Sequence, residues 1–291
     1  EKFHLNNSVQ DESLLNEWVC SEVFRSAGYP APRVSHARVR INDRDLGFYV
    51  LKEGFDRRFL ARNFRRPNGN LYDGGFCQDL DAELELDLSG GEKERADLKR
   101  LVAACGEQDP ARARKALEEQ VDVAAFLKFM ALELMLGHWD GYCQNVNNYR
   151  VYFEPGSTGR AHFLPHGMDQ VLGDPGASVL DGPRGMLAAA IMRDPAWRAA
   201  YREQVKALLT FFDAKKLEAK VEALERRLQP ALKALETDLI SEPDVMEMLG
   251  FAEREELYAF LKRYDVRSAY TNEDFEREGA ALNALLTQLG R

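Results

Sequence analysis

Hydrophobic and polar positions divide the first third of the chain into alternating elements. In residues 8–28 the apolar side chains recur every three or four positions, the spacing of one helical face, and a glycine closes the segment. Residues 33–41 and 46–54 alternate apolar and polar side chains on either side of the turn sequence "NDRD". The pattern therefore predicts a helix followed by a β-hairpin. Residues 1–7 are typical of the end of a strand, and residues 56–64 of a short helix.

A change of composition follows this region. Gly, Asp and Glu are frequent in residues 69–91, and the hydrophobic periodicity is weak there. We place a domain boundary at residues 80–92, which gives a small mixed lobe of residues 1–88 and a larger, mainly helical lobe of residues 89–291. The predicted fold class is α+β.

Three successive helices are predicted beyond the boundary, over residues 92–105, 109–120 and 122–139. Asp109 and Asp122 precede the second and third helix, where an Asp side chain can cap free backbone N–H groups. The third helix is apolar on nearly all sides, so we expect it to be central.

The rest of the chain is predicted to contain two strands and then helices. The strands, residues 148–153 and 161–166, flank the turn sequence "EPGSTGR". From about Arg184 to the end of the chain the pattern is helical.

Composition and charge exclude several classes of protein. With 291 residues, of which 45% are hydrophobic, the chain can bury a sizeable core. Its net charge of −9 argues against binding nucleic acid or an anionic membrane through overall charge. The longest apolar run, residues 126–139, is interrupted by Lys128 and Glu133 and is shorter than the about 20 residues that span a bilayer. The four cysteines lack the Cys-x-x-Cys spacing of a zinc ribbon or a thioredoxin-type pair.

Candidate chemistry lies after the third predicted helix. Asp140 follows this helix, Asn145 lies five residues further on, and Asp169 follows the two short strands. A kinase-like active site has the same order of parts: an Asp that orients the acceptor, an Asn on a metal ion, and an Asp that holds metal against the nucleotide phosphates. Carboxylate and amide oxygens suit Mg²⁺. The spacing alone also fits residues that only cap helices and turns.

Longer stretches of the chain resemble the CotH kinase family, the spore coat protein H type of atypical bacterial kinase. They comprise residues 5–42, 46–60, 69–75 and 137–173, of which the combination "HWDGY…N..NNY…MDQ" is the most specific. The resemblance implies a protein-kinase-like two-lobed fold, ATP with Mg²⁺ (or Mn²⁺), and phosphorylation of protein Ser or Thr side chains. It also implies a secreted or cell-surface protein.

The same resemblance implies roles for individual residues. Asp140 corresponds to the catalytic Asp, Asn145 to a metal ligand, and Asp169 to the Asp of the nucleotide-bound metal. In the first lobe, Lys2 and Glu17 are the candidates for the ion pair that binds the nucleotide phosphates, and Lys52 is the reserve candidate.

The adenine-facing hinge is expected near Glu53 and Gly54.

Three features depart from the family or from ordinary kinases. Gly167 stands where relatives commonly have a further Asp, Tyr142 stands two residues after the catalytic Asp where ordinary kinases often have Lys, and no Gly-rich phosphate loop is present. If Gly167 need not adopt positive φ, Gly167→Asp is expected to strengthen metal-dependent ATP binding.

Other functions stay open from the sequence. The same fold could use ATP for adenylylation or for ligation of an amino acid to a Glu side chain, or the chain could be a non-catalytic surface binding module. His162, His166 and Asp169 could gather as a metal site at one end of the strand pair. His138 is expected to brace the loop by hydrogen bonds rather than to transfer protons.

Overall fold

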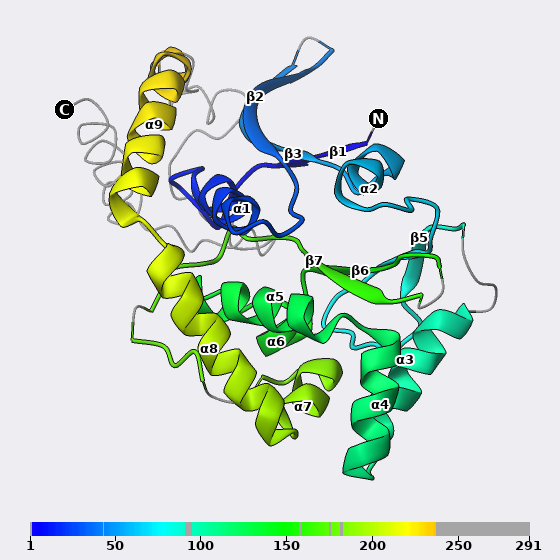
Figure 1. Ribbon diagram of the computed structural model, residues 1–291. Helices are drawn as coiled ribbons and strands as arrows, with labels where there is room; N and C mark the ends of the chain where they lie inside the picture. Colours follow the sequence, from blue (N-terminus) through cyan, green and yellow to red (C-terminus); the bar gives the residue numbers. More distant parts are fainter. Residues whose placement is uncertain are drawn as a thin grey trace, which may run out of the picture. The chain divides into compact units, whose positions relative to one another are not determined.

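The computed structural model describes residues 2–42, 44–90, 95–156, 159–174, 176–180 and 183–236, which form an α+β fold (Figure 1). The strands are β1 (Phe3–Asn6), β2 (Val34–Ile41), β3 (Arg44–Glu53), β4 (Leu71–Asp73), β5 (Glu85–Leu88), β6 (Tyr149–Phe153) and β7 (Ala161–Pro165). The helices are α1 (Asn16–Ser26), α2 (Arg57–Asn63), α3 (Ala96–Gly106), α4 (Pro110–Gln120), α5 (Val123–Met135), α6 (Tyr142–Asn145), α7 (Met186–Met192), α8 (Pro195–Phe211) and α9 (Ala214–Glu236).

The chain divides into two compact units. One comprises residues 1–41 and 49–214, and the other comprises residues 42–48 and 215–291. All candidate site residues belong to the first unit. Residues on both sides of the boundary expected at 88–89 also belong to it, so the division into two lobes stays a prediction. The helical pattern expected beyond residue 236 lies outside the described residues.

The first sheet has the strand order β1-β3-β2, which confirms the predicted hairpin and the strand before it. β1 and β3 are antiparallel, and His4 lies opposite Lys52 in their register. The helix after β1 starts later than the hydrophobic spacing predicts, because the Asp11 carboxylate accepts hydrogen bonds from the backbone N–H groups of Ser13 and Asn16. These bonds hold residues before Asn16 in turns.

The second sheet has the order β5-β4-β6-β7. β4 and β5 lie in the acidic stretch where no strand was predicted, and β4 pairs antiparallel with β6. Both strands are short, so alternation has little length over which to show. Within β4, Leu71 and Tyr72 are fully buried. This sheet therefore joins strands from both sides of the expected boundary.

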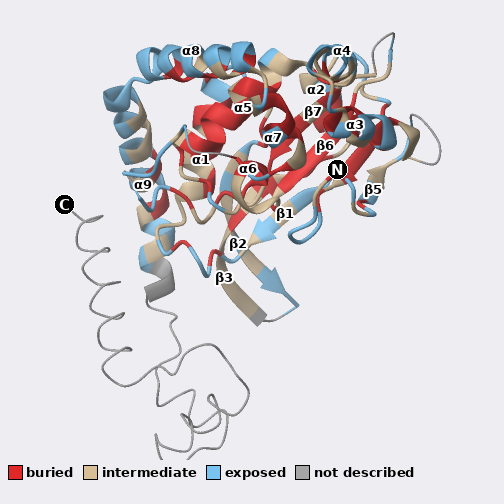
Figure 2. Ribbon diagram, turned by 90° about the horizontal axis from the view of Figure 1, so that it is seen from below, coloured by how far each residue is buried: buried red, intermediate tan, exposed pale blue. Residues whose placement is uncertain are grey.

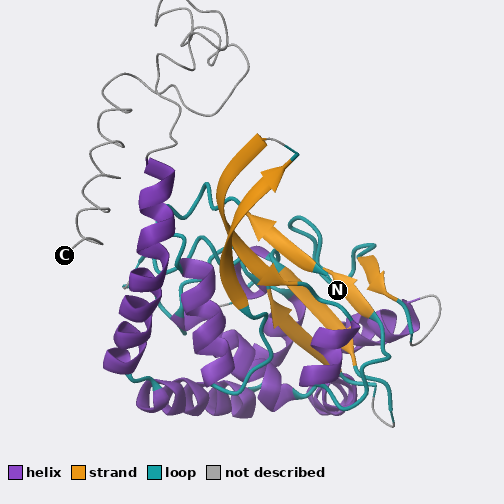
Figure 3. Cartoon of the chain, turned by 90° about the horizontal axis from the view of Figure 1, so that it is seen from above, coloured by secondary structure: helices purple, strands orange, loops and turns teal. Residues whose placement is uncertain are grey.

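Helix α5 is central, as predicted. It packs against β7 and α8 (Figure 1). Figure 3 shows helices lying alongside the strands. Figure 2 shows that the buried residues concentrate in α5, β6 and β7. The expected caps are present: Asp122 Oδ1 accepts from Ala125 N at 3.0 Å, and Asp109 Oδ1 accepts from Arg112 N at 2.9 Å. Within the described residues, no helix combines the length and apolar character that a membrane crossing needs.

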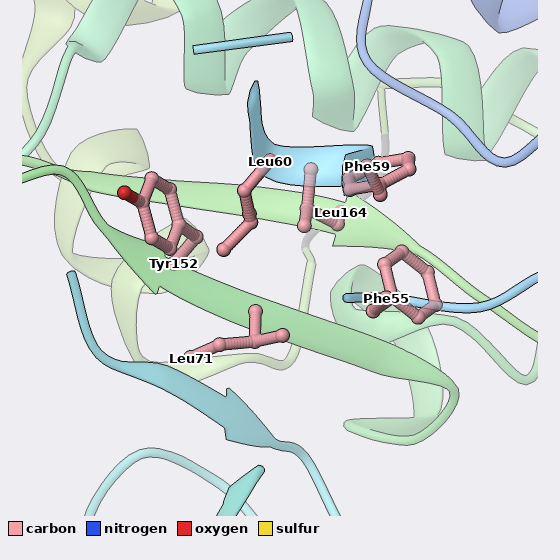
Figure 4. Close-up of a cluster of buried hydrophobic side chains, with 6 residues drawn as sticks. All are labelled: Phe55, Phe59, Leu60, Leu71, Tyr152 and Leu164. Carbon is pink, nitrogen blue, oxygen red and sulfur yellow. The ribbon is translucent and has the colours of Figure 1, made fainter. Parts of the chain in front are cut away.

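A cluster of buried side chains holds the segment after β3, which consists of a turn and α2, against the second sheet. The cluster (Figure 4) consists of Phe55, Phe59, Leu60, Leu71, Tyr152 and Leu164. The ring of Phe55 also contacts the rings of His4 and His166, at centroid distances of 6.3 and 5.6 Å. The aromatic packing thus places the end of β3 beside the chain that follows β7.

Candidate active site

Asp140 lies between α5 and α6, and three asparagine side chains donate hydrogen bonds to its carboxylate. The Nδ2 atom of Asn145 lies 2.6 Å from Asp140 Oδ1. The Nδ2 atoms of Asn147 and Asn148 lie 3.0 and 2.7 Å from Oδ2. A carboxylate has about four acceptor positions, so these amides leave about one of them open. The carboxylate is therefore held in a fixed orientation and can still accept one more hydrogen bond.

The backbone of this loop is strained. Val146 and Asn148 adopt φ of 47° and 48°, in the left-handed region that a β-branched residue such as Val rarely enters. Such outliers persist only where surrounding contacts hold them, and they are frequent at functional sites. With this backbone path, three amides within residues 145–148 reach one carboxylate.

His138 braces the loop, as the sequence predicted. Its side chain is buried, and its Nε2 lies 3.0 Å from the backbone oxygen of His166. Burial lowers the pKa of His138 to about 4, so the ring is neutral near pH 7 and donates from Nε2 to this carbonyl. The backbone N–H of His166 in turn donates to the backbone oxygen of Asn148 at 3.0 Å. These bonds join the Asp140 loop to the segment after β7.

Asp169 is anchored by the first elements of the chain. Its Oδ2 accepts from Asn6 Nδ2 at 2.9 Å, and its backbone oxygen accepts from Asn16 Nδ2 at 2.8 Å. Asn6 ends β1 and Asn16 starts α1. The two asparagines therefore fix Asp169 against residues that lie about 150 positions earlier in the sequence.

Gly167 fills a place where no side chain fits. Its φ is +56°, and a Cβ atom there would lie 2.4 Å from both Cγ and Oδ1 of Asn148. Asn148 is one of the residues that hold Asp140. The condition for the expected benefit of Gly167→Asp, a backbone free of positive φ, is thus not met, so that benefit is not expected in this protein.

The buried ion pair forms between Glu17 and Lys52, not between Glu17 and Lys2. Lys52 Nζ lies 2.7 Å from Glu17 Oε1, and the two side chains are 4% and 1% exposed. Lys52 Nζ also lies 3.4 Å from Nδ1 of His166. Burial and the nearby Lys52 ammonium hold the pKa of His166 well below its usual range, so this ring is neutral and can accept from Lys52.

Lys2 and Glu53 have other partners. Lys2 is 45% exposed and pairs with Asp87 at 3.1 Å, because the register of β1 with β3 places His4 rather than Lys2 beside Lys52. The Glu53 carboxylate is engaged by Arg33 and Arg62. A role of Glu53 in a nucleotide hinge stays a prediction.

A pocket of about 560 Å³ adjoins the Asp140 loop. Asn147, Asn148 and His166 form one part of its lining, and Arg150 and Asp73 form another. The Arg150 guanidinium pairs with Asp73 at 2.6 Å and lies 5.5 Å from the centre of the Phe55 ring. The pocket therefore opens beside residues that orient Asp140 and beside the neighbour of Lys52.

The donor set fits a hard cation in part. Asp169 and Asn145 carry oxygen donors, which suit Mg²⁺ or Mn²⁺. Because Asn145 turns its Nδ2 towards Asp140, its Oδ1 is available to a cation. Among the described residues, no group of three His, Cys, Asp or Glu side chains is arranged to hold a metal. The alternative site of His162, His166 and Asp169 is therefore not formed, and His162 instead lies 3.6 Å from Glu154.

Four asparagines of the site were missed by the sequence analysis: Asn6, Asn16, Asn147 and Asn148. Asparagine is common in turns and caps, so single positions carry little signal. The density of amides in "QNVNNY" after a buried helix is the feature that could have indicated them.

Comparison with known proteins gives one family. The family described as "CotH kinase protein" matches residues 1–241 of the chain. This range includes the whole of the first compact unit, and it also includes residues 42–48, which interrupt that unit.

Three relatives show the same similarity at low identity. The chain is 24% identical over 250 residues to "Inner spore coat protein H" of Bacillus subtilis, which covers 79% of this chain and 68% of that protein. It is 23% identical over 257 residues to "Invasin CotH7" of Rhizopus delemar, covering 79% of this chain and 43% of that protein. It is 26% identical over 190 residues to "Invasin CotH2" of the same organism, covering 59% of this chain and 32% of that protein. The chain thus spans less than half the length of these two fungal relatives.

Proposed function

The chain belongs to the CotH kinase family, and we propose that it is a phosphotransferase that uses ATP with Mg²⁺ or Mn²⁺ to phosphorylate protein Ser or Thr side chains. The observation that carries the proposal is the Asp140 carboxylate, which is oriented by three amides. Two of these amides belong to Asn147 and Asn148, which line a pocket. Phosphoryl transfer depends mainly on positioning and on charge stabilisation, and these contacts supply positioning.

Asp140 is the proposed catalytic residue. Its free acceptor position takes the hydrogen bond of the acceptor hydroxyl, which points the hydroxyl oxygen at the terminal phosphorus of ATP. The oxygen forms a bond to this phosphorus, the bond from phosphorus to the bridging oxygen breaks, and ADP leaves. The hydroxyl proton passes to Asp140. The amides of Asn145, Asn147 and Asn148 keep the carboxylate in place during this step.

The nucleotide is proposed to bind through Lys52, Asp169 and Asn145. The buried carboxylate of Glu17 holds the Lys52 ammonium, and His166 accepts a second of its hydrogens. The third hydrogen is the one offered to a phosphate oxygen. The oxygens of Asp169 and Asn145 would hold the metal ion, which neutralises phosphate charge when bound. Lys52 replaces Lys2 in this role because only Lys52 pairs with Glu17.

The names of the relatives suggest where the protein acts. They belong to a spore coat protein and to invasins, and we propose that this protein also acts at a cell or coat surface. Surface labelling of intact source cells with a reagent that does not cross membranes tests this: the protein should be labelled without lysis, and labelling only after lysis contradicts it.

Labelled nucleotides test the reaction. After incubation with Mg²⁺ or Mn²⁺ and a mixed pool of acceptor proteins, label from γ-labelled ATP should enter protein, and label from α-labelled ATP should not. Incorporation from the α position would favour adenylylation instead. An increase in the acceptor's mass by one amino acid would favour ligation, and no labelling together with no nucleotide binding would favour a binding module.

Melting measurements test the nucleotide site separately. ATP should raise the melting temperature only when Mg²⁺ or Mn²⁺ is present, because a ligand that binds the folded chain alone stabilises it. Asp169→Ala should cancel this increase. A metal-independent increase, or one that persists in the variant, would place the nucleotide elsewhere.

A further inference from the structure

A buried carboxylate lies beneath the Asp140 loop. Glu133 stands near the end of α5, its side chain is 0% exposed, and its neighbours in the helix, Leu132 and Leu134, are buried core residues. Its Oε1 accepts from the backbone N–H of Tyr142 at 3.2 Å, and its Oε2 accepts from the N–H of Cys143 at 3.0 Å. The Cys143 thiol hydrogen-bonds the same carboxyl.

The chain between Asp140 and these amides is shaped around Glu133. Gly141 connects them, and a Cβ atom on Gly141 would lie 2.6 Å from Glu133 Oε1 and 2.7 Å from Cδ2 of His138. A side chain at position 141 would therefore force the loop away from the carboxylate. The Gly141 N–H donates to the His138 oxygen at 3.0 Å, and its own oxygen accepts from Asn145 N at 3.0 Å.

These bonds connect Glu133 to Asp140, the proposed catalytic residue, and to Asn145, a proposed metal ligand. Asp140 immediately precedes Gly141. The backbone N–H of Asn145 donates to the Gly141 oxygen, and the side-chain amide of Asn145 donates to the Asp140 carboxylate. A buried carboxylate without a cationic partner is costly, and an apolar residue would pack at this position without that cost. The position of Glu133 therefore indicates a role other than packing.

We propose that Glu133 is the positioning residue of the Asp140 loop, and that its ionised carboxylate fixes the first backbone N–H groups of α6 and thereby the orientation of Asp140 and Asn145. When Glu133 takes up a proton, one oxygen becomes a donor and faces a backbone N–H that is also a donor, so one of the two bonds is lost. The proposal rests on the proposed function only for the consequence that the loop has for transfer.

The groups around Glu133 do not titrate in the same range of pH. Burial raises the pKa of Glu133 to about 7, although its hydrogen bonds to Cys143 and Tyr142 oppose this. Burial also raises the pKa values of the Tyr29 phenol and the Cys143 thiol well above their usual range, and it lowers the pKa of His138 to about 4. No Lys or Arg among the described residues forms an ion pair with Glu133. Glu133 is thus the group of this cluster that changes charge near neutral pH.

The loop and the fold respond to this ionisation in opposite directions. Because the pKa is higher in the folded chain, the contribution of Glu133 to stability is fully present below about pH 4.5 and is lost as the pH rises through about 7. The hydrogen bonds that hold the loop form as the pH rises through the same range. If Glu133 only packed in the core, its ionisation would lower the stability of the fold and the rate of phosphate transfer together as the pH rises.

An NMR titration tests the loop contact without any assay of activity. In the wild-type protein, the backbone amide signals of Tyr142 and Cys143 should shift with a common midpoint near pH 7, where Glu133 ionises. The shift should disappear in Glu133→Gln and persist in the control Glu118→Gln, since Glu118 is exposed on α4. Amides that do not titrate in the wild-type protein would overturn the proposal, and this result remains decisive if Glu133→Gln does not fold.

Kinetics test the consequence for transfer. We expect Glu133→Gln to lower kcat about 10- to 100-fold above neutral pH, as a small misplacement of reacting groups does, while KM for ATP changes by less than about twofold. The rise of kcat with pH near 7 should be lost in this variant and kept in Glu118→Gln. A Glu133→Gln protein with the wild-type kcat and the same rise would overturn the proposal. If neither the wild-type protein nor its variants transfer phosphate, but the backbone amides of Tyr142 and Cys143 titrate near pH 7, the proposed function fails and the control of the loop by Glu133 stands.

Discussion

Neutral amides, rather than further acids, surround the candidate catalytic residue. Asp140 accepts from three asparagines, and Asp169 accepts from a fourth, so each carboxylate is oriented by donors that carry no charge. A cationic side chain in the place of Asn6 would compete with the proposed metal ion for the oxygens of Asp169. The spacing of Asp140 and Asn145 in the sequence put both in one candidate site, but the sequence could not assign Asn6 or Asn16, because their contacts with Asp169 depend on how distant elements pack.

Lys52 and Lys2 show why a strand pattern alone does not select the lysine that pairs with Glu17. Both lie in or next to strands of the first sheet, and alternation does not say which face meets α1. The register decides it, since Lys52 reaches Glu17 and Lys2 reaches Asp87 near the surface.

The two lysines should differ in their contribution to stability. Lys52→Met leaves the Glu17 carboxylate buried without its partner, and we expect a loss of about 3–5 kcal/mol in the free energy of unfolding. Lys2→Met breaks an exposed pair and should lose at most about 1 kcal/mol. Urea denaturation measures both. The double variant Lys52→Met with Glu17→Leu should recover part of the loss, and equal losses in the two single variants would contradict the assignment.

Gly167 is expected to resist substitution for two separable reasons. Gly167→Ala adds backbone strain at φ +56° and a clash with Asn148, so we expect a loss of about 1–3 kcal/mol and a lower rate of transfer as Asn148 leaves Asp140. Gly28→Ala is the matched control, because Gly28 has φ +69° but its nearest contact, Lys128 Nζ, is 3.9 Å away. Thermal melting and transfer assays should show the loss of activity in Gly167→Ala alone. A fully active Gly167→Ala protein would show that Asn148 does not orient Asp140.

At the scale of elements, segments with a clear periodic pattern were predictable, and β4, β5 and α6 were not. The hairpin, α2, α4, α5 and the pair β6–β7 follow from alternation, helical spacing and Asp caps. β4 and β5 escaped because they are three and four residues long and lie in an acidic stretch. α6 escaped because it is a single turn, fixed by contacts with Glu133 rather than by its own sequence.

The cap of α5 provides a test at this scale. Asp122→Ala removes the acceptor for the Ala125 N–H, and we expect it to destabilise the protein by about 0.5–2 kcal/mol. Asp122→Asn keeps an acceptor oxygen at the same place and should restore most of this loss. Chemical denaturation of the three proteins measures the difference. Equal instability of the Asn and Ala variants would show that the charge of Asp122, rather than its capping bond, is what matters.

At the scale of the molecule, the candidate site lies within one compact unit. Asp140, Asn145, Asp169, Lys52 and Glu17 all fall in residues 1–41 and 49–214, and the family match extends over this range. The order of Asp140, Asn145 and Asp169 along the chain fits a kinase but also fits caps and turns. The four longer stretches that resemble the CotH kinase family are what indicated the family before the structure. The pairing of β4 with β6 in the second sheet could not be predicted in this way, because 75 or more residues lie between the paired positions.

The central claim is that Asp140 performs the transfer, and Asp140→Asn tests it most directly. The substitution keeps the size of the side chain but removes the charge and one acceptor oxygen. We expect the rate of transfer from γ-labelled ATP to fall about 10²- to 10⁴-fold, while far-UV circular dichroism and cooperative melting remain as in the wild-type protein, because the side chain is not part of the core. Asp109→Asn, which alters a helix cap far along the chain from this loop, should transfer at the wild-type rate. A folded Asp140→Asn protein that transfers phosphate as fast as the wild type would contradict the account.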